Sequence, residues 1–160
     1  MKRFIPILGI ALFTITSCAS TNSMNDFYSK YDGKATIVPL PKFAINLAKK
    51  TTDAKILDYI NSAKVFVMTD AGKSKQNRVM KDLASATKGD KYEQMVKMKV
   101  KNNNINASYL QQNGQINELI LGVNGLNNVL VIDSKVNLTE AQLEEALSNI
   151  DISDLEGILK

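Results

Sequence analysis

Residues 92–133, YEQMVKMKVKNNNINASYLQQNGQINELILGVNGLNNVLVID, contain the pattern that decides the fold. Asn-rich positions separate its apolar stretches, and an Asn-Gly pair supplies the positive φ angles that tight hairpin turns need. Turns are expected at residues 102–104, at 113–114, and at 124–125 with Asn127 and Asn128 close behind. The sequence therefore predicts four antiparallel strands joined as a meander, over residues 92–101, 105–112, 115–123 and 128–133.

The run VLVI at residues 129–132 is the most continuously apolar part of this meander. We expect it at the centre of the sheet or covered on both faces, because a strand with one solvated face alternates apolar and polar residues. That alternation occurs instead in the first strand, where Lys97, Lys99 and Lys101 share one solvated face.

Helical and extended patterns precede the meander. Helices are predicted over residues 26–31, 42–50, 53–63 and 74–87, and strands over residues 35–41 and 64–70. In the second of these helices Phe43 and Leu47 share one apolar face. Before the fourth, Gly72 is expected to allow the turn and Ser74 to cap the helix.

A last helix is predicted to begin at Thr139, which has the spacing of a capping box with Gln142. Leu138 and Leu143 are spaced as a hydrophobic staple across this helix start. The predicted buried stripe is Leu143, Ala146, Leu147 and Ile150, and a terminal turn is predicted at residues 153–156. Together these elements predict an α+β fold, in which a mainly antiparallel sheet packs against several helices.

The start of the chain has the organisation of a secretory signal. Lys2 and Arg3 precede an apolar run, FIPILGIALFTI, which is too short for a bilayer-spanning helix of about 20 residues. The stretch at residues 15–18, Ile-Thr-Ser-Cys, follows it and resembles the lipobox at which bacterial lipoproteins are acylated and cut. Cys18 is the only cysteine, so we expect it to carry lipid as the first mature residue, and an ordinary secreted protein is the alternative.

These features predict three segments: a cleaved lipoprotein signal peptide at residues 1–17, a lipidated tether at 18–25, and one α+β domain at 26–160. The membrane is then a partner through lipid on Cys18. The tether has no acidic run, which favours the outer membrane and its periplasmic side. Without Lys2 and Arg3, the 20 basic residues become 18 against 16 acidic ones. A balance so near neutrality argues against a nucleic-acid partner.

The lipobox-like start, the opening DFYSKYDGK, the stretch ATIVPLPKFAINLAKK, the later VFVMTD and above all residues 92–143 together resemble the domain-of-unknown-function family 4252. That family consists of small bacterial lipoproteins. The resemblance implies an envelope lipoprotein with an α+β domain and no assigned activity. It transfers no site residue, because the matching motifs are patterns of strands and turns.

The residues that common enzymes use are scarce. The chain has no histidine, and an acylated Cys18 would not serve as a nucleophile, so Ser-His-Asp and Cys-His catalysis are excluded. No cofactor or metal site is expected, and no catalytic residue is assigned. An enzyme would have to use carboxylates, lysines or tyrosines, which leaves a carboxylate-dependent hydrolase as an alternative.

The candidate binding residues are Lys97, Lys99 and Lys101, whose shared face could contact anionic lipid, glycan or an acidic protein. Lysines on strands also keep sheets soluble and discourage edge pairing, which is the structural alternative. The sequence therefore favours a non-enzymatic, lipid-anchored binding or adaptor module of the bacterial envelope. A sensor or carrier of lipid or of an anionic ligand is the second hypothesis.

Overall fold

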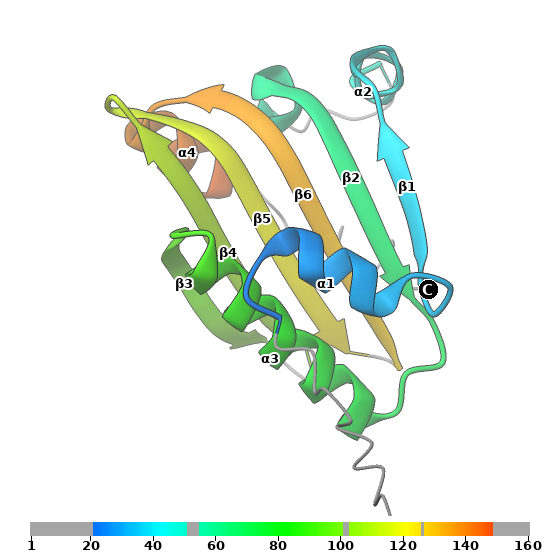
Figure 1. Cartoon of the computed structure of the whole chain (residues 1–160). Helices are drawn as coiled ribbons and strands as arrows, with labels where there is room; N and C mark the ends of the chain where they lie inside the picture. Colours follow the sequence, from blue (N-terminus) through cyan, green and yellow to red (C-terminus); the bar gives the residue numbers. More distant parts are fainter. Residues whose placement is uncertain (1–20, 51–54, 101–102, 126, 149–160) are drawn as a thin grey trace, which may run out of the picture.

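The computed structural model describes residues 21–50, 55–100, 103–125 and 127–148. It shows an α+β fold with one six-stranded antiparallel sheet, in the order β1-β2-β6-β5-β4-β3 (Figure 1). The strands are β1 (Thr36–Leu40), β2 (Ile60–Met68), β3 (Glu93–Val100), β4 (Asn103–Gln112), β5 (Gln115–Gly125) and β6 (Asn128–Leu138). The helices are α1 (Met24–Tyr31), α2 (Lys42–Ala48), η1 (Lys55–Tyr59, a 3₁₀ helix), α3 (Lys73–Gly89) and α4 (Glu140–Ser148).

The C-terminal meander is confirmed, because β3, β4, β5 and β6 are neighbours in the sheet in chain order. Asn113 and Gly114 both have positive φ, 54° and 78°, as a two-residue hairpin turn requires. The central position of the last strand is also confirmed, since β6 lies between β5 and β2. Its residues Leu130 and Val131 point to opposite faces and are each at most 1% exposed.

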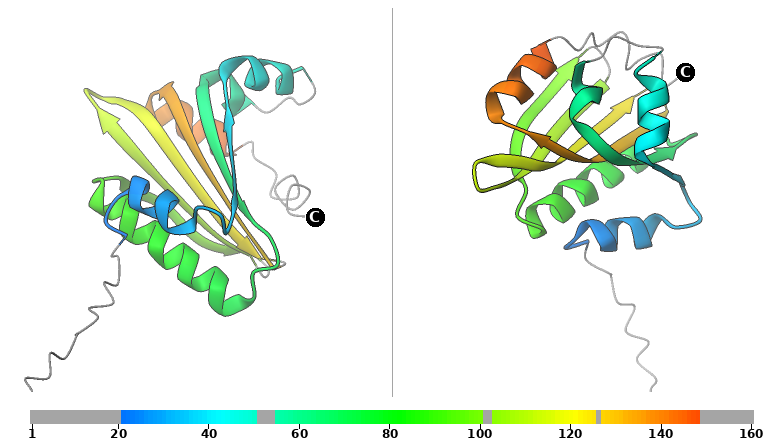
Figure 2. Two further views of the ribbon diagram at one scale, coloured as in Figure 1. Left: turned by 45° about the vertical axis from the view of Figure 1, so that its right-hand side comes forward. Right: turned by 90° about the horizontal axis from the view of Figure 1, so that it is seen from above.

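Helices cover both faces of the sheet, as the right-hand view of Figure 2 shows. We call the side that carries α1 and α3 the α1/α3 face, and Val129, Val131 and Asp133 of β6 point to it. Its core contains an aromatic cluster, in which the ring centroids of Phe27 and Phe66 are 5.2 Å apart. The other side, the α2/α4 face, buries the side chains Ile45, Val136, Leu138 and Leu143.

Polar contacts join α1 to α3. The Tyr31 hydroxyl donates a hydrogen bond of 2.6 Å to Asp82, and the Lys30 ammonium lies 2.7 Å from the same carboxylate. Burial opposes ionisation of Asp82, but these two donors outweigh it and lower its pKa. At the other end of α1, the Met24 amide donates to Asp90 over 2.7 Å. These contacts hold α1 across the sheet, where it forms one border of the site described below.

The predicted start of the last helix is confirmed in detail. The Thr139 amide donates to Gln142 Oε1 over 2.8 Å, and the Gln142 amide donates back to Thr139 Oγ1 over 3.3 Å, which is a capping box. Leu138 and Leu143 are both buried in one cluster, as the staple predicts. The predicted positions of Ile150 and of the turn at 153–156 are outside the described residues.

The prediction of a helix over residues 53–63 is wrong. Among the described residues of this range, 55–59 form a short 3₁₀ helix, and β2 begins at Ile60. The spacing of Ile56, Leu57 and Ile60 suits a helix, but pairing with β6 wins because Ile60 lies opposite Val136 in the sheet. Tertiary pairing of this kind overrides a local period.

The turn predicted before residue 128 begins later than expected, because β5 continues through Asn124 and Gly125. Asn124 is buried, and its side-chain amide donates to Gln76 of α3 over 3.2 Å. Gly125 is needed for close approach instead, since a Cβ there would overlap the Asn103 side chain. The chain turns after β5, where Asn127 has a φ of 65°, and β6 then extends to Leu138, beyond the predicted end at 133.

Three further helices differ from expectation. In α2 the predicted apolar face points outward, since Phe43 is 76% and Leu47 64% exposed while Ile45 is buried. At the start of α3 the N-cap is Gly72 with an ordinary φ, and the positive φ belongs to Asp70. Ser74 therefore lies within the first turn and does not cap it. α1 starts at Met24, two residues before the predicted start, so the last residues of the expected tether are folded.

Phe27 is buried and Phe43 is exposed, and this difference provides a stability test. Phe27→Ala should lower the free energy of unfolding by about 3–5 kcal/mol, because Phe27 is fully buried in the aromatic cluster. Phe43→Ala removes the same atoms from an exposed position and should change the free energy of unfolding by about 0.5 kcal/mol or less. Urea unfolding of both variants measures this, and equal losses would contradict the assigned core.

Candidate functional site

The candidate site lies on the part of the α1/α3 face that α1 borders. Here β2, β5 and β6 each carry ionisable side chains on this face. Elsewhere on the same face, the strand residues that pack against α3 are apolar. The register places Lys64 of β2 opposite Asp133 of β6, and Glu118 of β5 opposite Lys135 of β6. Each strand therefore contributes a charge next to one of opposite sign, an arrangement that stabilises cross-strand pairs.

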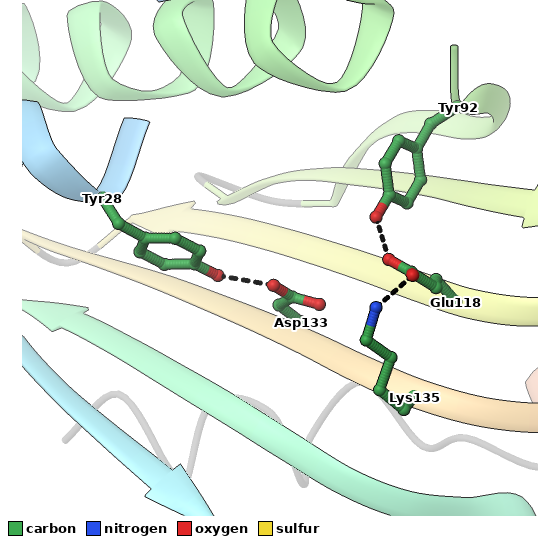
Figure 3. A network of polar contacts seen from close by, with 5 residues as sticks. All are labelled: Tyr28, Tyr92, Glu118, Asp133 and Lys135. Carbon is green, nitrogen blue, oxygen red and sulfur yellow. Dashed lines mark hydrogen bonds and ion pairs between the residues drawn. The ribbon is translucent and has the colours of Figure 1, made fainter. Parts of the chain in front are cut away.

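Tyr28 and Asp133 form the first half of the site. The Tyr28 hydroxyl, reaching down from α1, donates a hydrogen bond of 3.0 Å to Asp133 Oδ2 (Figure 3). Lys64 Nζ lies 4.2 Å from the centroid of the Tyr28 ring, within the range of a cation–π contact. This half thus combines an anion, a phenol and a cation from three different elements.

Tyr92, Glu118 and Lys135 form the second half (Figure 3). The Tyr92 hydroxyl donates to one oxygen of the Glu118 carboxylate, and the Lys135 ammonium donates to the other. The Glu118 side chain is 20% exposed and that of Lys135 57%, so the carboxylate is the more buried partner. Tyr92 precedes β3, and this chain of contacts therefore connects the edge of the sheet to its centre.

Burial affects the protonation of these groups. Burial, and next the charge of Asp133, raise the pKa of the Tyr28 hydroxyl, and burial with the hydrogen bond to Glu118 raises the pKa of Tyr92. Both phenols therefore remain protonated donors at neutral pH. Burial also raises the pKa of Asp133, although the Tyr28 hydrogen bond and the Lys64 charge partly oppose this effect.

Two cavities flank this network. The wider one has a volume of about 480 Å³ and lies beside the first half of the site. It is lined by Pro39, Leu40, Pro41, Ser62, Ala63, Lys64, Asp133 and Lys135. The narrower one has a volume of about 280 Å³ and lies between α3 and the strands β3 and β4. It is lined by Leu83, Ala84, Thr87, Lys88, Tyr92, Gln94, Lys97, Asn106, Ser108 and Ile120.

The structure places only part of the predicted lysine row. Lys97 is exposed and lines the narrower cavity. Lys99 belongs to β3 and pairs with Asn104 in the sheet, and its side chain is not described. Lys101 and the predicted lipidation residue Cys18 are outside the described residues.

No helix in the part of the chain that the structure describes is long and apolar enough to cross a membrane. In the same residues, no group of three or more acidic side chains is placed to hold a metal ion.

A family model described as "Domain of unknown function (DUF4252)" matches residues 28–146, from the tyrosine of the first half of the site into α4. The chain belongs to this family. The resemblance noted in the sequence is thereby confirmed. A search of curated proteins gave no match.

Within this DUF4252 domain, sequence reasoning missed Tyr28, Lys64 and Asp133 as a group. The sequence also does not single out Glu118, which the structure places within hydrogen-bonding reach of Tyr92. The available signal was the two-residue period, which puts Asp133 and Lys135 on one face of β6. It does not reveal that α1 crosses that face, because the position of α1 depends on contacts distant in the sequence.

The raised pKa of Asp133 predicts a pH dependence of stability. The Asp133 carboxyl group binds its proton more tightly in the folded protein than in the unfolded chain. The contribution of Asp133 to the free energy of unfolding therefore decreases as pH rises from below 3.8 through the raised pKa. Asp133→Asn should remove this decrease, so the variant gains stability relative to wild type as pH rises. Urea unfolding between pH 3.5 and 7 measures the difference.

A matched control is Asp58→Asn, which changes a carboxylate whose side chain is 69% exposed and pairs with Lys49. This control measures the effect of losing an exposed carboxylate, and the relative gain of Asp133→Asn should exceed it. The assignment fails if Asp133→Asn and wild type keep a constant difference across the range.

Proposed function

We propose that this protein is a lipid-anchored, non-enzymatic binding module of the bacterial envelope, with its binding site on the α1/α3 face. One observation carries the proposal: the charges beside the wider cavity are already partnered within the protein. Tyr28 donates to Asp133, and Lys135 donates to Glu118. Such prearranged groups suit recognition of a polar partner without reorganisation of the site.

The anchor is the part of the proposal that rests on the sequence. Ile-Thr-Ser-Cys at residues 15–18 follows a charged and then an apolar segment, the order in which a lipoprotein signal is organised. More than one acyl chain on Cys18 would give stable attachment to the membrane. We infer an outer-membrane protein that faces the periplasm, because the tether is small, polar and free of acidic residues.

The anchor is tested by growing bacterial cells that express the chain with alkyne-labelled palmitate. The wild-type protein should incorporate the label and begin at Cys18 by mass spectrometry. Cys18→Ala should lose the label and keep residues 1–17, whereas Ser20→Ala should behave as wild type. Label on the Cys18→Ala variant, or a mature start elsewhere, would contradict lipidation at this residue.

The binding role is tested with a photoreactive amino acid placed at neighbouring positions of β2. Ser62 lines the wider cavity, whereas the preceding residue, Asn61, does not. Irradiation of intact cells should produce a reproducible adduct from position 62 and none from position 61. Lys64→Gln should reduce the adduct at 62 several-fold, because Lys64 lines the same cavity. Equal adducts from both positions would show that the cavity is not the contact.

A carboxylate-dependent hydrolase is the second candidate, and one observation favours it. Asp133 and Glu118 occupy adjacent strands in different surroundings, Asp133 beside a tyrosine and Glu118 beside a lysine and a tyrosine. Two carboxylates held in unlike environments can divide acid and base roles. Turnover of a captured ligand that is lost in both Asp133→Asn and Glu118→Gln would favour this candidate over pure binding.

A further inference from the structure

The narrower cavity exists because of how closely α3 approaches the middle of the sheet. Gly122 of β5 lets α3 pack tightly there, since a Cβ on Gly122 would lie 2.6 Å from Leu83 Cδ2. Beyond β5, the second half of α3 leaves a space of about 280 Å³ above β3 and β4. Leu83 and Ile120, both buried, form its apolar part.

Two cations line this space from different elements. Lys88 is in the last turn of α3 and Lys97 is on β3, and both residues are exposed. Among the described residues, neither ammonium group has a salt-bridge or hydrogen-bond partner. Lys30 and Lys135, in contrast, are each paired with a carboxylate. The cavity therefore has positive charge that nothing in the described chain neutralises.

Two polar side chains, Asn106 and Ser108, belong to the same wall. Ser108 is only 8% exposed, and no described residue hydrogen-bonds to its hydroxyl. Asn106 has its side-chain oxygen buried without a hydrogen-bond partner. The Ser108 hydroxyl is therefore a donor that no described residue uses and that an anion in the cavity can accept from, whereas the Asn106 oxygen is an acceptor and does not contact the anion.

We propose that this cavity binds a small organic anion. Its carboxylate or phosphate group lies between Lys88 and Lys97 and accepts a hydrogen bond from the Ser108 hydroxyl, and its apolar part packs on Leu83 and Ile120. Charge-assisted hydrogen bonds of this kind are among the stronger polar contacts in proteins. The volume is near the lower limit of known ligand sites, which indicates a ligand the size of a short-chain acid or a sugar phosphate.

This inference goes beyond the binding role proposed above and uses different residues, since the wider cavity contains neither Lys88 nor Lys97. It does not depend on lipidation of Cys18. The anionic group could belong to a free metabolite or to a lipid headgroup, because both present the same phosphate chemistry. The experiment therefore includes one arm for each source.

The test uses the full chain, purified in a nonionic detergent and labelled with ¹⁵N for NMR titration. Hexanoate and glycerol 3-phosphate are the anionic probes, and hexanol is the neutral counterpart of hexanoate. Saturable shifts of the amide signals of Lys97, Asn106 and Ser108 are expected with at least one anion and not with hexanol. Vesicles of phosphatidylglycerol form the lipid arm, and binding there without binding of free anions would assign the site to a headgroup.

Variants then connect binding to the cavity. Lys88→Gln and Lys97→Gln should each raise the dissociation constant of the bound anion about tenfold, and Ser108→Ala should raise it a few-fold. Lys81→Gln removes an equal charge from an exposed position of α3 outside the cavity and is the matched control. Thermal unfolding midpoints check that all variants remain folded.

Two results would overturn the proposal. One is equal shifts with hexanoate and hexanol, or no saturable shift with any anion or with the vesicles. The other is an anion affinity that Lys88→Gln and Lys97→Gln change no more than Lys81→Gln does. Either result leaves the lipid anchor and the wider cavity untouched, so failure here is distinguishable from failure of the proposed function.

Discussion

The antiparallel pairing of β2 with β6 is the constraint on which the rest of the structure depends. It places Phe66 opposite Val131 and joins the N-terminal elements to the meander. Since side chains alternate between faces, a slip of one residue would move the apolar set of β6 to the wrong side. The same slip would turn Asp133 away from Tyr28. The core and the candidate site are thus positioned by one register, and neither can be altered without the other.

The parts of the fold that could be predicted from sequence are those that local chemistry decides. The hairpin at Asn113–Gly114 needs two residues of positive φ, and Asn-Gly meets that need without help from distant contacts. The capping box of Thr139 and Gln142 likewise involves residues three apart. The central place of VLVI follows from burial on both faces, which its composition already requires.

The parts that could not be predicted depend on distant contacts. Asn124 looks like a turn residue until Gln76 of α3 is present to hydrogen-bond with it. Ile60 fits a helical stripe until Val136 lies beside it. On β3 the alternation shows that Lys97 lies on the opposite face from Val96 and Met98. The cavity next to it depends on the angle of α3, which no local pattern encodes.

The strand order has a consequence for how the polypeptide acquires its structure. β3 to β6 are joined by short hairpins, so they can assemble while most contacts are still local, and local contacts form fastest. β1 and β2 are synthesised first, yet β2 has its inner neighbour only when residues 128–138 arrive. The order of folding is therefore expected to run against the order of synthesis. Until β6 has emerged, β2 can pair only with β1 and its inner edge must remain unpaired, and this is the interval in which the first part of the chain is most exposed to proteolysis and misassembly.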